Sequence, residues 1–194
     1  MSVNPDTPAP IPDLADLIVH LARLGQSTAA TRLTAAQWMA LRFFARASRL
    51  SRTPSAFSCY HATTRGTASQ TVKSLVEMGL LARQSHATDG RSTILDVTEA
   101  GHAMLRRDPL EDLRHVLARL DPEAHAALAT ALGHAVSDLA HLRDVPVFGT
   151  CVDCAHCQHD AEGNVCLQSQ AYLSQGDMAA ICVEFRPAPT AAQS

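Results

Sequence analysis

The stretch from His61 to Gly101 constrains the fold of this 194-residue chain more than any other part of the sequence. Thr63 or Thr64 can cap the start of a helix, because a threonine oxygen accepts a bond from an otherwise unpaired backbone N–H. Apolar residues then recur at helical spacing and form one face: Ala68, Val72, Leu75 and Val76. Gly79 follows in the position where glycine commonly ends a helix. The stretch therefore predicts an amphipathic helix with a sharp stop.

A hairpin with a charged tip follows this helix. Leu80 and Leu81 open an extended segment, and the run Thr88–Arg91 has the composition of a turn. Alternating residues then predict a returning, half-buried strand: Thr93, Leu95 and Val97. Helix, glycine stop and hairpin in this order favour a winged helix-turn-helix. The plain alternative is a solvated helix followed by an ordinary hairpin.

The face of this helix that turns away from the apolar residues is polar and mildly basic. It carries Arg65, Thr67, Ser69, Gln70, Thr71, Lys73 and Ser74. Such side chains bond base edges and phosphates without steric conflict, so the face suits the major groove of DNA. The charge distribution agrees: between Arg32 and Arg107 there are roughly 11 Arg or Lys against 4 Asp or Glu, although the net charge of the chain is −3.

The run LLARQSHATDGRSTILDVTEAG resembles the wing signature of MarR-type regulators. The shared features are a Gly-Leu helix exit, an Asp-x-Arg tip and a Thr-Glu-x-Gly start to the next helix, and the resemblance covers roughly Leu33 to Leu142. It implies that the helix after the turn reads the major groove through Arg65–Lys73, and that the wing arginine, Arg91, reaches the minor groove. Gly90 departs from the pattern, because many members carry a second basic residue there, which implies a softer wing contact.

Apolar stripes and cap signals predict further helices on both sides of this unit. The start signals are Thr34 with Gln37, Thr53 with Pro54, Thr98, and Asp121 with Pro122. The helix after Thr53 is predicted to reach about Ala62 and to be the first helix of the helix-turn-helix. Cys59 on it is predicted to be a small core residue. The pair Asp108-Pro109 either kinks or restarts the helix that Thr98 begins.

The outer helices carry more apolar residues than a monomer can bury. The stripes are Leu14, Leu17, Ile18, Leu21 and Leu24 after Asp13, then Leu110, Leu113, Val116, Leu117 and Leu120, and finally Leu128, Leu132, Val136, Leu139 and Leu142. Their partner is expected to be the same helices of a second subunit, and the family resemblance also implies a homodimer. For the first stripe, a core helix is the alternative.

Composition excludes several classes of protein. Hydrophobic residues make up 46% of the chain and aromatic residues 4%, so an aliphatic helical core is expected. No apolar run reaches membrane length and no signal-peptide pattern opens the chain, so we expect no membrane partner and a cytoplasmic location. No nucleotide-binding glycine motif or catalytic triad is apparent, so no enzyme is expected.

Five of the six cysteines fall in the stretch after Pro146. Their spacing is Cys151-x2-Cys154-x2-Cys157-x8-Cys166-x15-Cys182. In a reducing compartment such a cluster is more often metal-binding or redox-active than a disulfide framework. The segment is too small and polar to fold around a core of its own, so a metal centre would supply what the core lacks. Ser174 with Asp177 predicts a short helix that delivers Cys182.

Three interpretations of this cysteine tail stay open. An iron–sulfur cluster suits Cys-x2-Cys-x2-Cys followed by remote cysteines. A structural zinc suits four thiolates, with His156 or His159 as further donors, but zinc modules usually pair two Cys-x2-Cys knuckles. The third is reduced cysteines without metal. The favoured ligands are the four that tie separate segments together, with Cys157 as a substitute: Cys151, Cys154, Cys166 and Cys182. The tail also resembles one carried by a minor branch of MarR-like proteins.

The predicted fold class is mainly α: a winged helix-turn-helix with a small β-hairpin wing, long dimerisation helices and a cysteine-rich metal-bearing tail. The predicted boundaries are a disordered N-terminus at 1–12, the winged-helix and dimerisation domain at 13–145, the tail at 146–187 and a disordered C-terminus at 188–194. We expect a homodimeric transcriptional regulator that binds inverted-repeat DNA and senses redox state, oxygen or iron through an iron–sulfur cluster.

Two alternatives to this function remain. One is a MarR-like repressor with a structural zinc and a small aromatic effector ligand. The other is an iron–sulfur redox protein or electron carrier. For the favoured function, a sensor, the tail is expected to change the spacing of the two recognition helices. It is expected to act through the dimerisation helices, because it follows them directly at Val145–Cys151.

Overall fold

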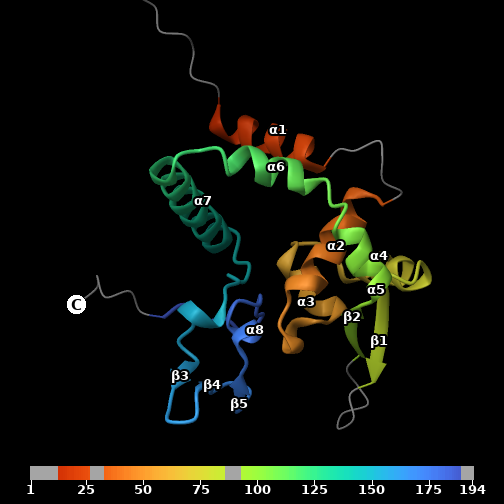
Figure 1. Cartoon of the computed structure of the whole chain (residues 1–194), viewed down its shortest axis with the longest axis vertical. Helices are drawn as coiled ribbons and strands as arrows, with labels where there is room; N and C mark the ends of the chain where they lie inside the picture. The colour runs from red at the N-terminus through yellow and green to blue at the C-terminus, as the bar shows by residue number, and fades with distance from the viewer. Residues whose placement is uncertain (1–12, 27–32, 86–92, 189–194) are drawn as a thin grey trace, which may run out of the picture.

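The computed structural model describes residues 13–26, 33–85 and 93–188. Within these ranges the chain is mainly helical, with a two-stranded hairpin and a small three-stranded sheet, as the predicted fold class requires. Figure 1 shows a winged helix-turn-helix, an outer set of three helices and a cysteine tail that lies beside the winged helix. No helix in the described ranges combines the length and apolarity needed to cross a membrane.

The winged helix-turn-helix is built in the predicted order. Its elements are α2 (Ala35–Arg46), η1 (Arg49–Ser51), α3 (Pro54–Tyr60), α4 (Arg65–Glu77), β1 (Leu81–Ser85), β2 (Thr93–Val97) and α5 (Glu99–Leu105). Their apolar faces meet in one core, whose most buried side chains include Trp38, Leu41, Phe43, Phe44, Val72, Leu75, Leu81 and Leu95.

Each α-helix of this unit begins at a threonine that caps it. Thr34 forms the predicted capping box with Gln37, accepting from the Gln37 N–H at 3.3 Å while the Gln37 side chain accepts from the Thr34 N–H at 2.8 Å. Thr53, Thr64 and Thr98 likewise accept from backbone N–H groups three residues on. These bonds satisfy N–H groups that the helix itself leaves unpaired, which is why the helices start at these residues.

The wing hairpin follows α4 through the predicted glycine stop. Gly79 has φ +70°, a conformation that a glycine adopts without steric cost. The two strands pair antiparallel from Leu81↔Val97 to Ser85↔Thr93. The predicted tip Thr88–Arg91 lies outside the described residues.

Asp108-Pro109 restarts the helix rather than kinking it, because α5 ends at Leu105 and α6 (Leu110–Leu117) begins afterwards. The Asp108 carboxylate is buried and accepts from the Leu110 N–H at 2.8 Å, which starts α6. It also accepts from Arg42 Nε at 2.8 Å and Arg42 Nη2 at 2.5 Å. This ion pair therefore fixes the outer helices to α2.

The outer set consists of α1 (Leu14–Gln26), α6 and α7 (Pro122–Leu142). Gly25 lies against α6, since a Cβ there would meet Leu113 at 3.0 Å. The predicted apolar stripes are largely uncovered within this chain, with Leu14, Leu24, Val136 and Leu142 each more than half exposed. In Figure 1 α1 and α6 run along one side of the molecule and α7 descends from them toward the tail.

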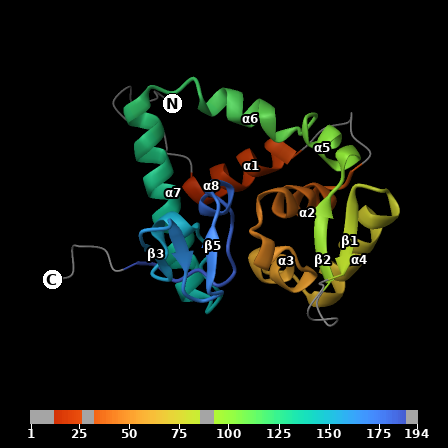
Figure 2. The same ribbon diagram turned by 60° about the horizontal axis from the view of Figure 1, so that its bottom comes forward.

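The cysteine tail folds into short pieces: η2 (Cys151–Asp153), β3 (Cys157–His159), β4 (Asn164–Cys166), β5 (Ala171–Leu173) and α8 (Gln175–Met178). The strands form an antiparallel sheet in the order β3-β4-β5. Figure 2 shows β3 and β5 near the lower end of α7. Ser174 and Asp177 form the predicted capping box at the start of α8. The chain then reaches Ile181, which is buried in the core of the winged helix.

One prediction about the core is wrong. Cys59 is exposed, although the sequence suggested a small core residue. Ala56, Phe57 and Ser58 are the buried residues of α3, so the cysteine is left on its outer side. The helix also ends at Tyr60, slightly before the predicted Ala62, because Ala62 turns the chain with φ +47°.

Candidate nucleic-acid interface and candidate metal centre

The structure keeps most of the predicted polar face on the outside of α4. Arg65, Thr67, Ser69, Gln70 and Lys73 are all exposed, whereas Ala68, Val72 and Leu75 of the same helix are buried. Lys73 lies 3.8 Å from Glu77, a loose pair between two exposed side chains that leaves the amine accessible. The α4 face thus offers cations, hydroxyls and an amide to a polyanionic surface.

Two residues of this face have partners inside the fold. The Thr71 side chain is half-buried, and its hydroxyl donates to the Thr67 carbonyl at 2.9 Å. Ser74 is also half-buried and accepts from Gln37 Nε2 at 2.9 Å, which ties α4 to α2. A face that the sequence treats as uniform therefore divides into an outer part around Arg65, Ser69 and Gln70 and an inner part that holds the helix in place.

A shallow hollow of about 250 Å³ lies where α3 and α4 begin. It is lined by Pro54, Ser55, Arg65 and Ser69. Two of its residues belong to the predicted interface, so this interface extends from α4 onto the start of α3. Ser55 is an addition that helical periodicity alone did not identify.

The wing contributes a cation that the sequence analysis did not single out. Arg83 is exposed on β1, two residues before the strand ends. Its position near the tip of the wing could have identified it, whereas strand alternation places it on the same face as the buried Leu81. The predicted wing residue Arg91 lies outside the described residues. On the other strand, Asp96 pairs with Arg52 at 2.6 Å, which fixes the wing to the loop before α3.

The five cysteines of the tail come together from separate segments. Cys151 lies in η2 and Cys154 directly follows it, while Cys157 and Cys166 are opposite each other on β3 and β4. Cys182 is brought to them by the residues after α8, and its N–H donates to the Gly149 carbonyl at 3.0 Å. The fold therefore gathers all five predicted ligand candidates.

Burial separates four of these cysteines from the fifth. In the tail, residues 146–187, the buried residues are Cys151, Cys154, Cys166, Ile181 and Cys182. Cys157 is only half-buried, and its thiol donates to the Met178 sulfur at 4.0 Å. The four buried cysteines are the ones that the sequence favoured as ligands.

The thiols influence one another electrostatically. Burial, followed by the negative charge of the other four tail cysteines, raises the pKa of the Cys151 thiol to about 11. Burial also raises the pKa of Cys182, although hydrogen bonds from the Glu184 N–H and from the Ser48 and Ser51 hydroxyls oppose it. Without a cation to balance them, the buried thiolates would repel one another.

Cys166 is the exception, because its pKa is lowered. Burial disfavours its thiolate, but hydrogen bonds from the Ser169 side chain and from the backbone N–H groups of Ser169 and Gln168 outweigh that effect. The Ser169 hydroxyl is buried and lacks a hydrogen bond of ordinary geometry, so its interaction with the sulfur is a weak one.

The described side chains do not form a ready-made site for one ion. No three His, Cys, Asp or Glu side chains in the described ranges are arranged to hold a metal ion. The two histidines offered as zinc donors do not change this: His156 is half-buried, and His159 is exposed with Nδ1 3.3 Å from Asn164 Oδ1. The thiols come together in one part of the tail, but they are not arranged around a single metal position.

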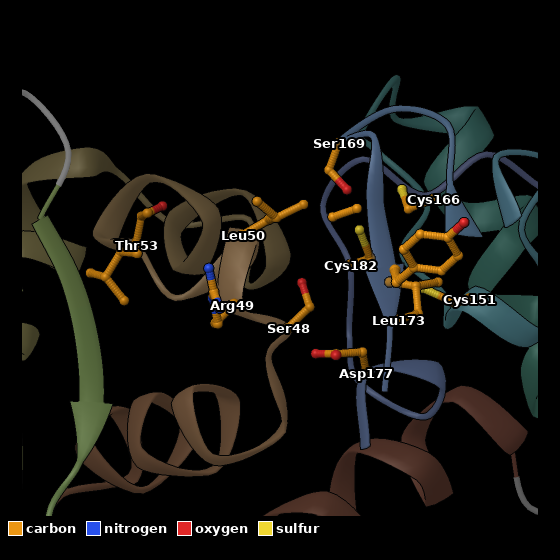
Figure 3. Close-up of a pocket in the computed structure, with 13 residues that line it drawn as sticks. Ser48, Arg49, Leu50, Thr53, Cys151, Cys166, Ser169, Leu173, Asp177 and Cys182 are labelled. Atoms are coloured by element: carbon orange, nitrogen blue, oxygen red, sulfur yellow. The ribbon is translucent and has the colours of Figure 1, made fainter. Parts of the chain in front are cut away.

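A pocket of about 380 Å³ separates the tail from the winged helix. Three of the cysteines line its tail side, Cys151, Cys166 and Cys182, together with residues of β5 and α8. Ser48, Arg49, Leu50 and Thr53 line the opposite side. Figure 3 shows the Cys182 and Ser169 side chains facing the loop that carries Ser48. The thiols thus lie at the junction of the two parts.

The winged helix-turn-helix is the part of the chain that matches known proteins. Residues 33–92 match the model of the MarR family. No curated protein matches the chain. A MarR transcriptional regulator from Methanosarcina mazei Go1 is similar in structure, at 19% identity and a TM-score of 0.55 over 66% of this chain and 97% of that one.

Two further structures give the same result. The transcriptional regulator SlyA matches at 20% identity and a TM-score of 0.54, over 66% of this chain and 95% of its own. The complex of S. aureus MepR with DNA matches at 19% identity and a TM-score of 0.52, over 65% of this chain and 95% of that one. The cysteine tail lies outside the segment that matches the family model. Residues 33–92, which include α2 to β1 of the winged helix-turn-helix, therefore match the MarR family model, and the chain shares its fold with these three structures.

Proposed function

We propose that this protein is a homodimeric, DNA-binding transcriptional regulator whose tail holds an iron–sulfur cluster and reports redox state, oxygen or iron. The observation that carries the proposal is the interior of the tail, where the buried side chains are four cysteines and one isoleucine. Such an interior has little apolar surface to stabilise it, so the fold of the tail depends on what the thiols bind.

DNA binding is supported by the winged helix and by the polar face of α4. The MepR structure with the same fold is a complex with DNA. In this chain Arg65, Ser69 and Gln70 are exposed on α4, and Arg83 adds an exposed cation on the wing. Arg65 can bind a phosphate or a guanine edge, whereas Gln70 and Ser69 can bond adenine or phosphate.

A homodimer is supported by the uncovered apolar faces of α1, α6 and α7. Side chains such as Leu14, Leu24, Val136 and Leu142 are more than half exposed in the single chain. A contiguous apolar surface of this kind marks an interface, and two-fold dimers read inverted repeats. Light scattering at micromolar concentration is expected to give the mass of two chains, and a monomer that binds a half-site tightly would contradict the dimer.

The four buried thiols fit an iron–sulfur cluster better than a single zinc ion. Sulfur atoms around one tetrahedral zinc stand about 3.8 Å apart, given bonds of about 2.3 Å. A cluster spreads its thiolates over several irons, so they stand farther apart, which suits thiols that do not close on one atom. Cys151, Cys154, Cys166 and Cys182 would hold the cluster, and it would supply a redox-active group that oxygen can destroy.

Metal and sulfide analysis of anaerobically purified protein tests the cofactor. We expect brown protein with iron and acid-labile sulfide that bleaches in air. The DNA affinity should change on bleaching by a coupling free energy of about 1–3 kcal/mol. Colourless protein with one zinc per chain would replace the cluster with a structural zinc. Coloured protein whose DNA affinity ignores cluster loss would retain the cofactor and reject the sensor.

Serine substitutions test the ligand set. Cys154→Ser and Cys166→Ser should each remove the cluster and reproduce the DNA affinity of bleached protein. Cys157→Ser is the matched control, because this thiol is less buried and already has the Met178 sulfur as a partner. Full loss of iron in Cys157→Ser would move this residue into the ligand set. Cys59→Ser should have no effect on iron content, since Cys59 lies exposed on α3.

A further inference from the structure

Two short segments of the tail, residues 148–149 and 181–183, lie against the winged helix and together form a clamp on it. Ile181 is 6% exposed and belongs to the core of the winged helix. Phe148 and Val183 are partly buried against the same core. Apolar side chains from the tail thus complete the interior of the DNA-binding unit, so the clamp is held by burial as well as by backbone bonds.

The second segment of the clamp pairs with the loop between α2 and α3. The Ile181 N–H donates to the Arg46 carbonyl, and the Ser48 N–H donates to the Ile181 carbonyl, both at 2.8 Å. The Val183 N–H donates to Ser51 Oγ at 3.0 Å. These three bonds fix the loop that runs from the end of α2 to the start of α3.

The clamp contacts both ends of α3. At the start, the Thr53 N–H donates to the carbonyl of Ser51 in the fixed loop at 2.8 Å, and Thr53 caps the helix. At the end, the ring of Phe148 meets the ring of Tyr60, the last residue of α3, with centroids 5.1 Å apart and planes at 68°. The position of α3 therefore depends on contacts with the tail at its two ends.

Any displacement of α3 would reach the candidate DNA interface. The Thr63 N–H donates to the Ser58 carbonyl of α3 at 3.0 Å, directly before the residue that caps α4. Ser55 of α3 also lines the hollow to which Arg65 and Ser69 of α4 contribute. The clamp thus lies one helix away from the side chains that are expected to bind DNA.

The two segments of the clamp are joined to each other beside the thiols. The Cys182 N–H donates to the Gly149 carbonyl at 3.0 Å, and Cys151 follows two positions after Gly149. Little apolar surface in the tail supports this junction, because the buried side chains there, apart from Ile181, are thiols. What the thiols bind therefore determines whether the two segments stay together.

We propose that the clamp regulates DNA binding within its own chain: when closed it fixes α3, and when open it releases α3 and with it the start of α4. This rests on the proposed function, since the metal centre is what closes the clamp, but it gives the signal a different route. The sequence suggested that the tail acts through the dimerisation helices, because Val145–Cys151 follows them directly. The clamp instead connects the tail to the helix-turn-helix of the same chain.

The test removes apolar contacts of the clamp without changing a cysteine. Ile181→Ala removes the side chain that enters the core, and Phe148→Ala removes the ring that meets Tyr60. Ile181→Val keeps most of the buried side chain and is the conservative control. Leu167→Ala removes a tail side chain that is 47% exposed, and it is the matched control for loss of an apolar residue outside the clamp.

Full-length protein of each variant is loaded anaerobically with iron and sulfide, and a second sample is stripped with a chelator. The first readout is the ratio of DNA Kd values between the loaded and the stripped protein. The second is hydrogen exchange at Ser48, whose N–H bonds to the Ile181 carbonyl when the clamp is closed. This readout does not depend on DNA. Circular dichroism checks that the helices of each variant remain folded.

In wild type, Ile181→Val and Leu167→Ala we expect a Kd ratio of about 5–150-fold and slower exchange at Ser48 on loading. In Ile181→Ala we expect unchanged iron content, fast exchange in both states and a ratio within about twofold of one. Phe148→Ala should give a ratio between these, because it opens the clamp at one end of α3 only. If Ile181→Ala does not fold, Phe148→Ala keeps the test decisive, since its side chain is only partly buried.

A wild-type ratio in Phe148→Ala and in folded Ile181→Ala, with iron bound, would overturn the clamp and leave the sensor intact. Slow exchange at Ser48 in stripped wild type would also overturn it, because the clamp would then stay closed without metal. A ratio lost equally in Leu167→Ala would count against it as well, since the effect would not be specific to the docked residues. A ratio of one in wild type would reject the proposed sensor, and the clamp as its route.

Discussion

The winged helix and the cysteine tail of this protein are stabilised by different chemistry. In the first, Trp38, Leu41, Phe43 and Phe44 are at most 2% exposed and pack with the apolar faces of α3, α4 and the wing. In the second, the buried side chains other than Ile181 are thiols. Burying one large aliphatic or aromatic side chain contributes about 1.5–3 kcal/mol, and the tail has only one such residue.

The stability of the two regions therefore depends on different interactions. The winged helix folds on its own apolar surface, whatever the metal content of the cell. The tail gathers thiols whose pKa values burial raises at Cys151 and Cys182, so its interior is unfavourable for thiolates until a cation is present. If the tail holds the proposed metal centre, one region is stable by itself and the other depends on the metal.

Removal of the metal is expected to produce the largest difference in stability between the two regions. Chelation of loaded protein is expected to abolish hydrogen-exchange protection across Cys151–Cys182 while α2–α5 stay protected. Structural metal sites contribute about 10–16 kcal/mol to small domains, more than the tail interior can replace. Equal loss of protection in both regions would mean that the winged helix also depends on the metal.

The next largest effect is expected at the buried ion pair of the winged helix. Hydrogen bonds from Arg42 and the Leu110 N–H outweigh burial and lower the pKa of Asp108. Asp108→Asn should destabilise the winged helix by about 3–5 kcal/mol in urea unfolding, because Arg42 is left buried without its counter-ion. Asp112→Asn, at an exposed carboxylate, is the matched control and should change little. Metal content should stay the same in both variants.

The next prediction concerns the charges on the predicted DNA-binding surface of α4 and the wing. Arg65→Ala should weaken DNA binding by about 1–3 kcal/mol and, if the contact is to phosphate, lower the salt slope by about 1. Arg119→Ala removes the same charge from the exposed end of the α6 region and should leave affinity unchanged. Arg91→Ala is expected to resemble Arg65→Ala if the wing tip reaches the minor groove. Equal losses at Arg65 and Arg119 would indicate only long-range attraction.

The smallest expected effect concerns pH and the winged helix alone. Burial lowers the pKa of His61, against a hydrogen bond to the Met39 backbone. The unfolded chain therefore binds this proton at a higher pH than the folded chain does. Stability should fall as the pH drops below the ordinary histidine value of about 6.5 and stop falling below the folded pKa. Urea midpoints at several pH values should show this slope in wild type and His102→Gln but a weaker one in His61→Gln.

Much of the winged helix could be predicted because its signals are local. Thr34, Thr53, Thr64 and Thr98 each cap a helix through a residue three positions away, and Gly79 ends one by its own backbone freedom. Helical and strand periodicity likewise places core residues within a few positions of one another. The ligand candidates of the tail follow from cysteine spacing in the same way.

What could not be predicted depends on contacts between distant segments. Nothing near Ile181 indicates that it pairs with Ala47 and enters the core of the winged helix. Nothing near Ser51 in the sequence indicates that its hydroxyl oxygen accepts from the Val183 N–H. Cys59 shows the opposite error. Its neighbours in the sequence are apolar, but the residue itself is exposed on a short helix. Tertiary packing decided each of these positions.

The pairing of residues 181–183 with the loop after α2 has a consequence for how the protein is made. Ser51 and Val183, which bond across it, are separated by 132 positions in the chain. At about 5–20 residues per second, a ribosome needs on the order of ten seconds to synthesise that length. During this interval the winged helix can fold while the niche for Ile181 stays open. A nascent chain can therefore fold its winged helix before the tail is made, and the proposed metal centre would have a time window for loading before Cys182 is enclosed.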